Sequence, residues 1–220
     1  MKMKTAACTV ALVMASGSLA MGAVIATSDD LDFVVGSGSN LSVLVIDFND
    51  GAAQESFAWG YRWDGSATGQ DLLEAIEGAD SNLSFNSTSF VTEVNYFDGT
   101  TSHSGVSDFG AGALSFGYYL AGGSADTFDN EDFSFTGTIP ISGGGVTLPS
   151  SFLISPSGTA GRALENGSWD ALSFGAFNPE TFDHLVPPGP EAPQAAAIPE
   201  PSVTGLLASL LLICGLRRKR

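Results

Sequence analysis

The chain has 220 residues and a formal net charge of −16, from 24 acidic and 8 basic side chains. The charge is unevenly distributed: residues 27–198 contain 23 acidic side chains against only Arg62 and Arg162, a net of −21. Binding to nucleic acid depends on Lys and Arg side chains that neutralise phosphates, so this composition excludes nucleic acid as a partner.

The first 26 residues have the three-part pattern of a secretory signal peptide. A positively charged start is followed by a short apolar run over residues 6–15 and then by small residues suited to signal-peptidase cleavage. The apolar run is shorter than the roughly 20 residues that span a bilayer, which argues against a permanent anchor. Cleavage after Ala20 and cleavage after Ala26 both fit the pattern. We therefore predict export through the Sec translocon.

Residues 27–185 are predicted to form one acidic, β-rich extracellular domain. No cysteine lies between Cys8 and Cys214, so an apolar core rather than disulfides must stabilise it. Short apolar runs separated by Gly, Asp and Asn favour strands. The clearest strand covers residues 41–48, where a continuous β-branched run is typical of a strand buried on both faces. Alternation over residues 57–63 predicts a second strand.

One helix is predicted after these two strands. Thr68 and Asp71 have the spacing of a capping box, in which the two side chains satisfy backbone N–H groups at the first turn. An apolar stripe with helical spacing follows, formed by Leu72, Leu73 and Ile76. This segment is the only convincing helix of the predicted domain.

Five later apolar runs are predicted as strands, at residues 90–96, 113–120, 133–141, 146–154 and 169–177. Together these elements predict a mainly β protein: an antiparallel β-sandwich with one short inserted α-helix, flanked by an N-terminal signal peptide and a C-terminal single apolar helix. Residues 43–83 also resemble a segment of an uncharacterised family of exported bacterial proteins. That resemblance implies no activity.

The end of the chain changes composition twice. Residues 186–198 contain four prolines and no aromatic residue, which predicts a semi-extended spacer and places the end of the folded domain near Leu185. Residues 199–220 then combine a Pro-Glu-Pro element with an apolar run over 203–216 and a basic end. The element consists of Pro199, Glu200 and Pro201, and the basic cluster of Arg217, Arg218, Lys219 and Arg220.

This tail resembles the PEP-CTERM sorting signal of Gram-negative bacteria. The resemblance implies cleavage near the Pro-Glu-Pro element by an exosortase, an integral-membrane enzyme, and delivery to the cell surface or to extracellular polysaccharide. The apolar run would be about 21 Å long as a helix, short of the ~30 Å hydrocarbon core, so it fits a transient inner-membrane anchor. The basic cluster would keep its end in the cytoplasm.

The most distinctive cluster of the domain lies on the second predicted strand. Trp59, Tyr61 and Trp63 share one strand face and could stack on sugar rings, while Arg62 and Asp64 could bind hydroxyls. The alternative, which we favour, is that the three rings belong to the core, because aromatic residues at strand spacing are usually buried.

Other chemistry has weaker support. Asp126, Asp129 and Asp132 are candidate Ca²⁺ ligands, although they do not form an EF-hand pattern and a solvated acidic turn is the favoured interpretation. His103 and His184 have no metal-ligand spacing, so no metal or other cofactor is expected. A secreted glycoside hydrolase with a carboxylate pair is a third alternative. The leading hypothesis is a non-catalytic surface or matrix protein.

Overall fold

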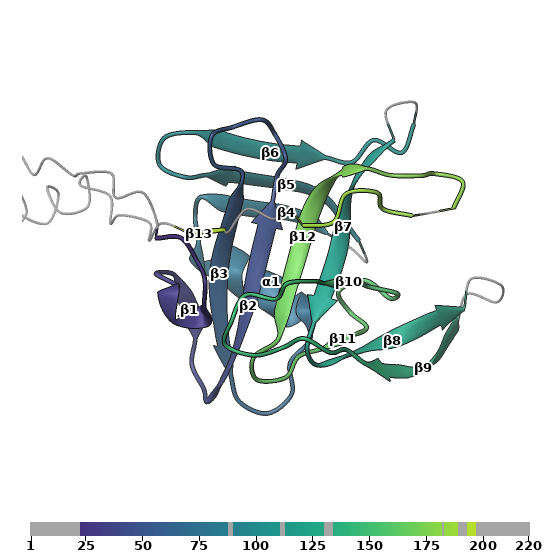
Figure 1. Cartoon of the computed structure of the whole chain (residues 1–220), viewed down its shortest axis with the longest axis horizontal. Helices are drawn as coiled ribbons and strands as arrows, with labels where there is room; N and C mark the ends of the chain where they lie inside the picture. The colour runs from purple at the N-terminus through teal and green to yellow at the C-terminus, as the bar shows by residue number, and fades with distance from the viewer. Residues whose placement is uncertain are drawn as a thin grey trace, which may run out of the picture.

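A computed structural model describes residues 23–87, 90–110, 113–129, 134–181, 183–188 and 193–196 (Figure 1). The described chain is mainly β and contains one α-helix. Most of the predicted signal peptide and the whole PEP-CTERM tail, residues 199–220, lie outside the described residues. Within the described ranges, no helix is long and apolar enough to cross a membrane.

The largest sheet has seven strands, in the order β1-β3-β2-β12-β7-β10 with β13 also beside β3. Their bounds are β1 (Val34–Gly36), β2 (Asn40–Asp47), β3 (Ser56–Trp63), β7 (Leu114–Ala121), β10 (Leu153–Ile154), β12 (Trp169–Ala176) and β13 (Gln194–Ala195). Two three-stranded sheets accompany it. They consist of β4 (Leu83–Ser87), β5 (Val91–Phe97) and β6 (Ser102–Val106), and of β8 (Ser124–Asp129), β9 (Ser134–Pro140) and β11 (Arg162–Ala163).

The large sheet is mixed: three of its strand pairings are antiparallel, as predicted, and three are parallel. Its central strands β2 and β12 run parallel, with Val43 opposite Trp169. The short strands β1 and β13 also run parallel to β3. All other pairings in the three sheets are antiparallel. A parallel pair needs a long connection, and here more than a hundred residues separate β2 from β12.

Both faces of the large sheet are covered, as the apolar run over residues 41–48 predicted. Leu44 and Ile46 of β2 face a core that includes helix α1 (Gly69–Ala79) and strands β4 and β5. Val43 and Val45 face a second core, where Leu148 and residues near the described N-terminus cover the sheet. Figure 1 shows α1 behind the large sheet and β5 and β6 across its upper end.

Helix α1 confirms the predicted capping box. The Thr68 hydroxyl accepts a hydrogen bond from the Asp71 backbone N–H, and the Asp71 carboxylate accepts one from the Thr68 backbone N–H at 2.8 Å. The predicted apolar stripe, Leu72, Leu73 and Ile76, is buried. The local sequence signals, a cap at the first turn and one apolar face, therefore match the position of this helix against the core.

The predicted strand at 146–154 is wrong except for β10 at its end. Residues before β10 form a loop whose backbone bonds to the N-terminal segment, with Leu148 N–H donating to the Ala26 carbonyl at 2.9 Å. Pro149 has no N–H to give to a ladder, which disfavours a continuous strand here. Leu148 and Phe152 instead pack over the second core.

The predicted spacer is also wrong at its C-terminal end. Gln194 and Ala195 pair with Phe57 and Ala58 of β3. Ala195 is 3% exposed, and Ala196 is fully buried. The packed domain therefore continues beyond Leu185 to at least Ala196.

Candidate functional site

The aromatic face of β3 lies in the core. Trp59 is fully buried and Trp63 is 5% exposed, while Tyr61 is half-buried and stacks on Trp63 with ring centroids 5.5 Å apart. The Trp59 Nε1–H donates a 2.9 Å hydrogen bond to the buried carboxylate of Asp80, just after α1. The indole rings are thus used for packing, and their faces are not open to a sugar ring.

The polar members of the same predicted site are exposed. Arg62 lies on the opposite face of β3, beside a hollow of about 250 Å³ whose lining also includes Asp29, Ser39 and Asn166. Asp64 accepts hydrogen bonds from the backbone N–H and the hydroxyl of Ser39, both at 3.0 Å. These bonds lower the pKa of Asp64. The predicted carbohydrate cluster is therefore divided between the core and the surface.

Of the three predicted Ca²⁺ ligands, the structure describes the side chain of Asp126. Asp126 of β8 accepts a 2.8 Å hydrogen bond from the Thr138 hydroxyl of β9. Asp129 ends β8, and Asp132 lies outside the described residues. In the part of the chain that the structure describes, no three His, Cys, Asp or Glu residues are grouped to hold a metal ion.

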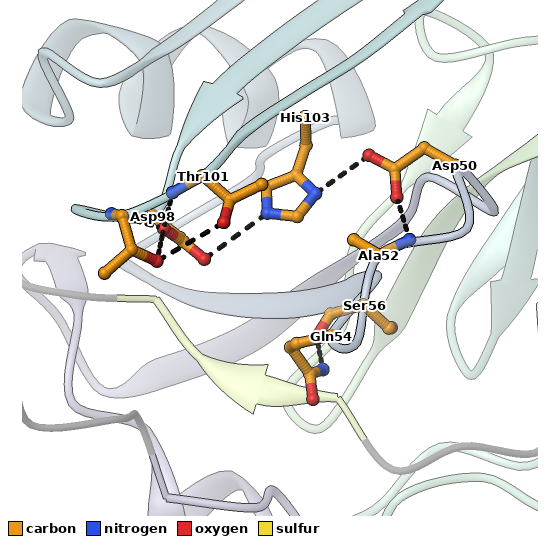
Figure 2. A network of polar contacts seen from close by, with 8 residues as sticks. Asp50, Ala52, Gln54, Ser56, Asp98, Thr101 and His103 are labelled. Atoms are coloured by element: carbon orange, nitrogen blue, oxygen red, sulfur yellow. Dashed lines mark hydrogen bonds and ion pairs between the residues drawn. The ribbon is translucent and has the colours of Figure 1, made fainter.

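A buried histidine joins two carboxylates that are distant in sequence (Figure 2). His103 of β6 is 1% exposed, and its Nδ1 lies 2.9 Å from Asp50 Oδ2 and its Nε2 lies 3.4 Å from Asp98 Oδ2. A neutral imidazole donates from only one nitrogen, so both contacts are hydrogen bonds only when the ring is doubly protonated. Each of the two ring nitrogens of His103 thus faces one carboxylate.

Local turns place the two carboxylates. Asp50 follows β2 in a turn where Asn49 and Gly51 have positive φ values of 47° and 82°, a conformation that Asn and Gly adopt most readily. Asp98 accepts 2.6 Å bonds from the backbone N–H groups of Thr100 and Thr101. Burial raises the pKa of Asp98, but these bonds and the one from His103 outweigh it, so the pKa lies below its ordinary value.

Aromatic rings surround the histidine. The ring of His103 lies 4.8 Å from that of Phe57, 5.4 Å from that of Phe48 and 6.3 Å, nearly parallel, from that of Tyr96. Phe48 directly follows β2 and Phe57 belongs to β3, both of the large sheet. Tyr96 and His103 belong to the β4-β5-β6 sheet. The histidine therefore connects two sheets, and sequence reasoning missed it because its partners are 53 and 5 residues away.

A second buried polar network surrounds Arg162. Its Nε and Nη2 donate to Asp170 Oδ1 at 2.9 and 2.8 Å, and both side chains are fully buried. Tyr118 also donates its hydroxyl to Asp170, and Arg162 Nη1 donates to the Gly122 carbonyl at 2.6 Å. Burial raises the pKa of Asp170 despite the nearby guanidinium. Burial, followed by the Asp170 charge, raises the pKa of Tyr118 well above its ordinary value.

Another hollow lies over the second core. It has a volume of about 590 Å³, and its lining includes Val45, Ser56, Phe152, Pro187 and Pro193. Residues 189–192, which connect the prolines on its rim, lie outside the described chain. The hollow contains no described ionisable side chain in its lining.

Comparisons with protein-family models, with curated proteins and with solved structures found no match to this chain.

Proposed function

We propose that this chain is a non-catalytic, exported protein of the cell surface or extracellular matrix that an exosortase sorts and processes. The observation that carries the proposal is the order of features at its end: Pro199-Glu200-Pro201, an apolar run over 203–216 and a terminal basic cluster. This order resembles a PEP-CTERM signal. The signal-peptide pattern of the first 26 residues supports export by the same route.

The folded domain is compatible with such processing. Ala196 N–H donates a 2.9 Å hydrogen bond to the Ala58 carbonyl of β3. The Pro-Glu-Pro element begins three residues later, so a cut near it leaves every described element of the domain intact. The strongly acidic body, without a single lysine between residues 27 and 198, supports a soluble domain after release.

The large sheet and the β4-β5-β6 sheet, with α1 beside it, form the two layers of a proposed β-sandwich. Side chains from both layers share one apolar core, which includes Leu44 and Trp59 from one layer and Val94 and Tyr96 from the other. A domain packed around one shared core suits a surface or matrix component. Its principal buried polar groups, His103 and Arg162, are engaged in bonds within the fold.

Co-expression with an exosortase tests the sorting proposal. The mass of the exported protein is compared in a Gram-negative host with and without the enzyme, and loss of the apolar run and basic cluster is expected only with it. Glu200→Ala should block this loss. Glu180→Ala, the same change at an exposed loop position, is the matched control and should be processed normally. An intact tail in both hosts would contradict the proposal.

A second candidate function is binding of extracellular carbohydrate at the Arg62 hollow. The guanidinium, the Asp29 carboxylate and the polar groups of Ser39 and Asn166 around about 250 Å³ could bind sugar hydroxyls. Calorimetric titration with the host polysaccharide tests it. Arg62→Gln should weaken binding, whereas Trp59 substitutions should act only through stability. Equal binding by wild type and Arg62→Gln would exclude this hollow.

A further inference from the structure

The described ends of the domain are paired with each other. Ala195 N–H donates to the Ala23 carbonyl at 2.9 Å, and Ile25 N–H donates to the Pro193 carbonyl at 2.7 Å. Val24 and Gln194 form an antiparallel bridge between these bonds. We call these two paired segments, residues 23–26 and 193–196, the terminal clasp.

The terminal clasp is attached to the body on both sides. Ile25 is fully buried in the second core, together with Val43 and Val45 of β2. Strand β13 pairs with β3 at Phe57 and Ala58, beside the place where β1 covers the rest of that edge. The clasp therefore supplies core volume and covers an edge strand, which would otherwise present unpaired backbone groups.

We propose that signal peptidase cuts this chain upstream of Ala23, after Ala20, so that the terminal clasp stays in the mature protein. This inference rests on the proposed export. Signal peptidase requires small residues at positions −1 and −3 from the cut. For cleavage after Ala20, Ala20 itself occupies position −1 and Ser18 occupies position −3. This cut leaves all of residues 23–26 in place.

Cleavage after Ala26, the alternative that fits the sequence equally well, would remove contacts that stabilise this fold. It would remove Ile25 from the second core and with it both clasp hydrogen bonds of the N-terminal segment. It would also remove the Ala26 carbonyl that accepts the 2.9 Å bond from Leu148. Strand β13 would then lose its outer partner, because β3 is on its other side.

The C-terminal cut must also leave the terminal clasp intact. Ala196 is fully buried and bonded to β3, so an exosortase cut must fall after it. Both processing sites therefore lie just outside one paired structure at one edge of the sheet. The mature domain begins upstream of Ala23 and ends downstream of Ala196.

The N-terminus of the exported protein tests the inference directly. The full chain is expressed in a Gram-negative host, and the exported form is analysed by intact mass and N-terminal sequencing. An N-terminus at Met21 is expected. An exported protein that begins at Thr27 would overturn the inference and leave export standing, whereas a chain that retains Met1 in the cytoplasm would overturn export as well.

Matched substitutions add a second readout. Ala20→Leu places a large residue at the proposed cut and should abolish or relocate it, whereas Ala26→Leu, at an exposed side chain, should leave the N-terminus at Met21. A form beginning at Thr27 should melt at a lower temperature than one beginning at Met21. Equal melting temperatures, or a block by Ala26→Leu alone, would contradict the proposal.

Discussion

The indole Nε1–H of Trp59 donates a 2.9 Å hydrogen bond to the Asp80 carboxylate, and both side chains are fully buried. The bond joins the middle of β3 to the residue that ends α1, and Asp80 also accepts a bond from the Asn82 backbone N–H at 2.9 Å. Trp59, which the sequence suggested as a stacking surface for sugar rings, therefore forms a contact between the helix and the sheet.

Trp59→Phe should therefore destabilise the domain by about 2–3 kcal/mol, because it leaves a buried carboxylate oxygen without its donor. Trp63→Phe is the matched control: Trp63 is also buried and stacks on Tyr61, but its exchange removes mainly apolar area. We expect a smaller loss of about 1 kcal/mol there. Urea denaturation of both variants measures the difference, and equal losses would count against the Asp80 bond.

The two contacts of His103 should differ in strength. Asp50 lies 2.9 Å from Nδ1 and Asp98 lies 3.4 Å from Nε2. Double-mutant cycles that combine His103→Phe with Asp50→Asn or with Asp98→Asn measure each coupling energy. We expect about 1–3 kcal/mol for the Asp50 pair and less for the Asp98 pair, because both partners are carboxylates but the first contact is shorter. A larger coupling to Asp98 would contradict the geometry.

The Arg162 network should tolerate the loss of both charges better than the loss of one. Arg162→Met leaves Asp170 buried without its cation and should cost about 3–5 kcal/mol. Adding Asp170→Asn to that variant removes the uncompensated carboxylate, so the double variant should recover part of the loss. Denaturant midpoints at neutral pH test this order, and a double variant less stable than Arg162→Met would refute it.

Stability should fall at alkaline pH partly through Tyr119. Burial raises the pKa of this phenol to about 12, whereas in the unfolded chain it titrates near 10. Between these two pKa values the folded state retains a proton that the unfolded state loses. The contribution of Tyr119 to the stability of the folded state is therefore complete below pH 10 and is lost as the pH rises toward 12. We expect roughly 0.5–1 kcal/mol per pH unit, after allowance for solvent screening.

Tyr119→Phe provides the comparison for this pH dependence. The variant lacks the titrating group but retains Tyr118, whose pKa is also raised, so any contribution of Tyr118 is common to both proteins. Between pH 10 and 12 the variant should lose less stability than the wild type. Parallel pH profiles from urea denaturation would show that Tyr119 is not responsible.

Elements with strong local signals could be predicted from the sequence. The β-branched run that became β2 and the capped stripe that became α1 have patterns that do not depend on distant residues. Runs at 57–63, 90–96, 113–120, 133–141 and 169–177 also correspond to strands β3, β5, β7, β9 and β12. In β3, β7 and β12 the local preference agrees with the burial that the fold imposes.

Features that depend on distant partners were missed. Strands β1 and β13 are three and two residues long and are strands only because β3 offers its edge. His103 meets Asp50 across 53 residues. The proline-rich composition before β13 indicated a spacer, yet prolines at 187, 188 and 193 do not prevent the alanines that follow from packing. The composition of a segment indicates which backbone conformation it prefers. It does not indicate which strand edge is available to pair with that segment.

The terminal clasp should contribute measurably to stability. Ile25 is fully buried against the second core, so Ile25→Ala should cost about 2–4 kcal/mol through lost apolar contact and the cavity left behind. Val24→Ala removes a side chain that is 59% exposed on the same strand segment and should change stability by less than about 0.5 kcal/mol. Both variants retain the backbone pairing with residues 193–195, so their difference isolates the buried side chain. Denaturation of the mature proteins measures it, and a similar small effect of both would mean that residues 23–26 only rest on the domain.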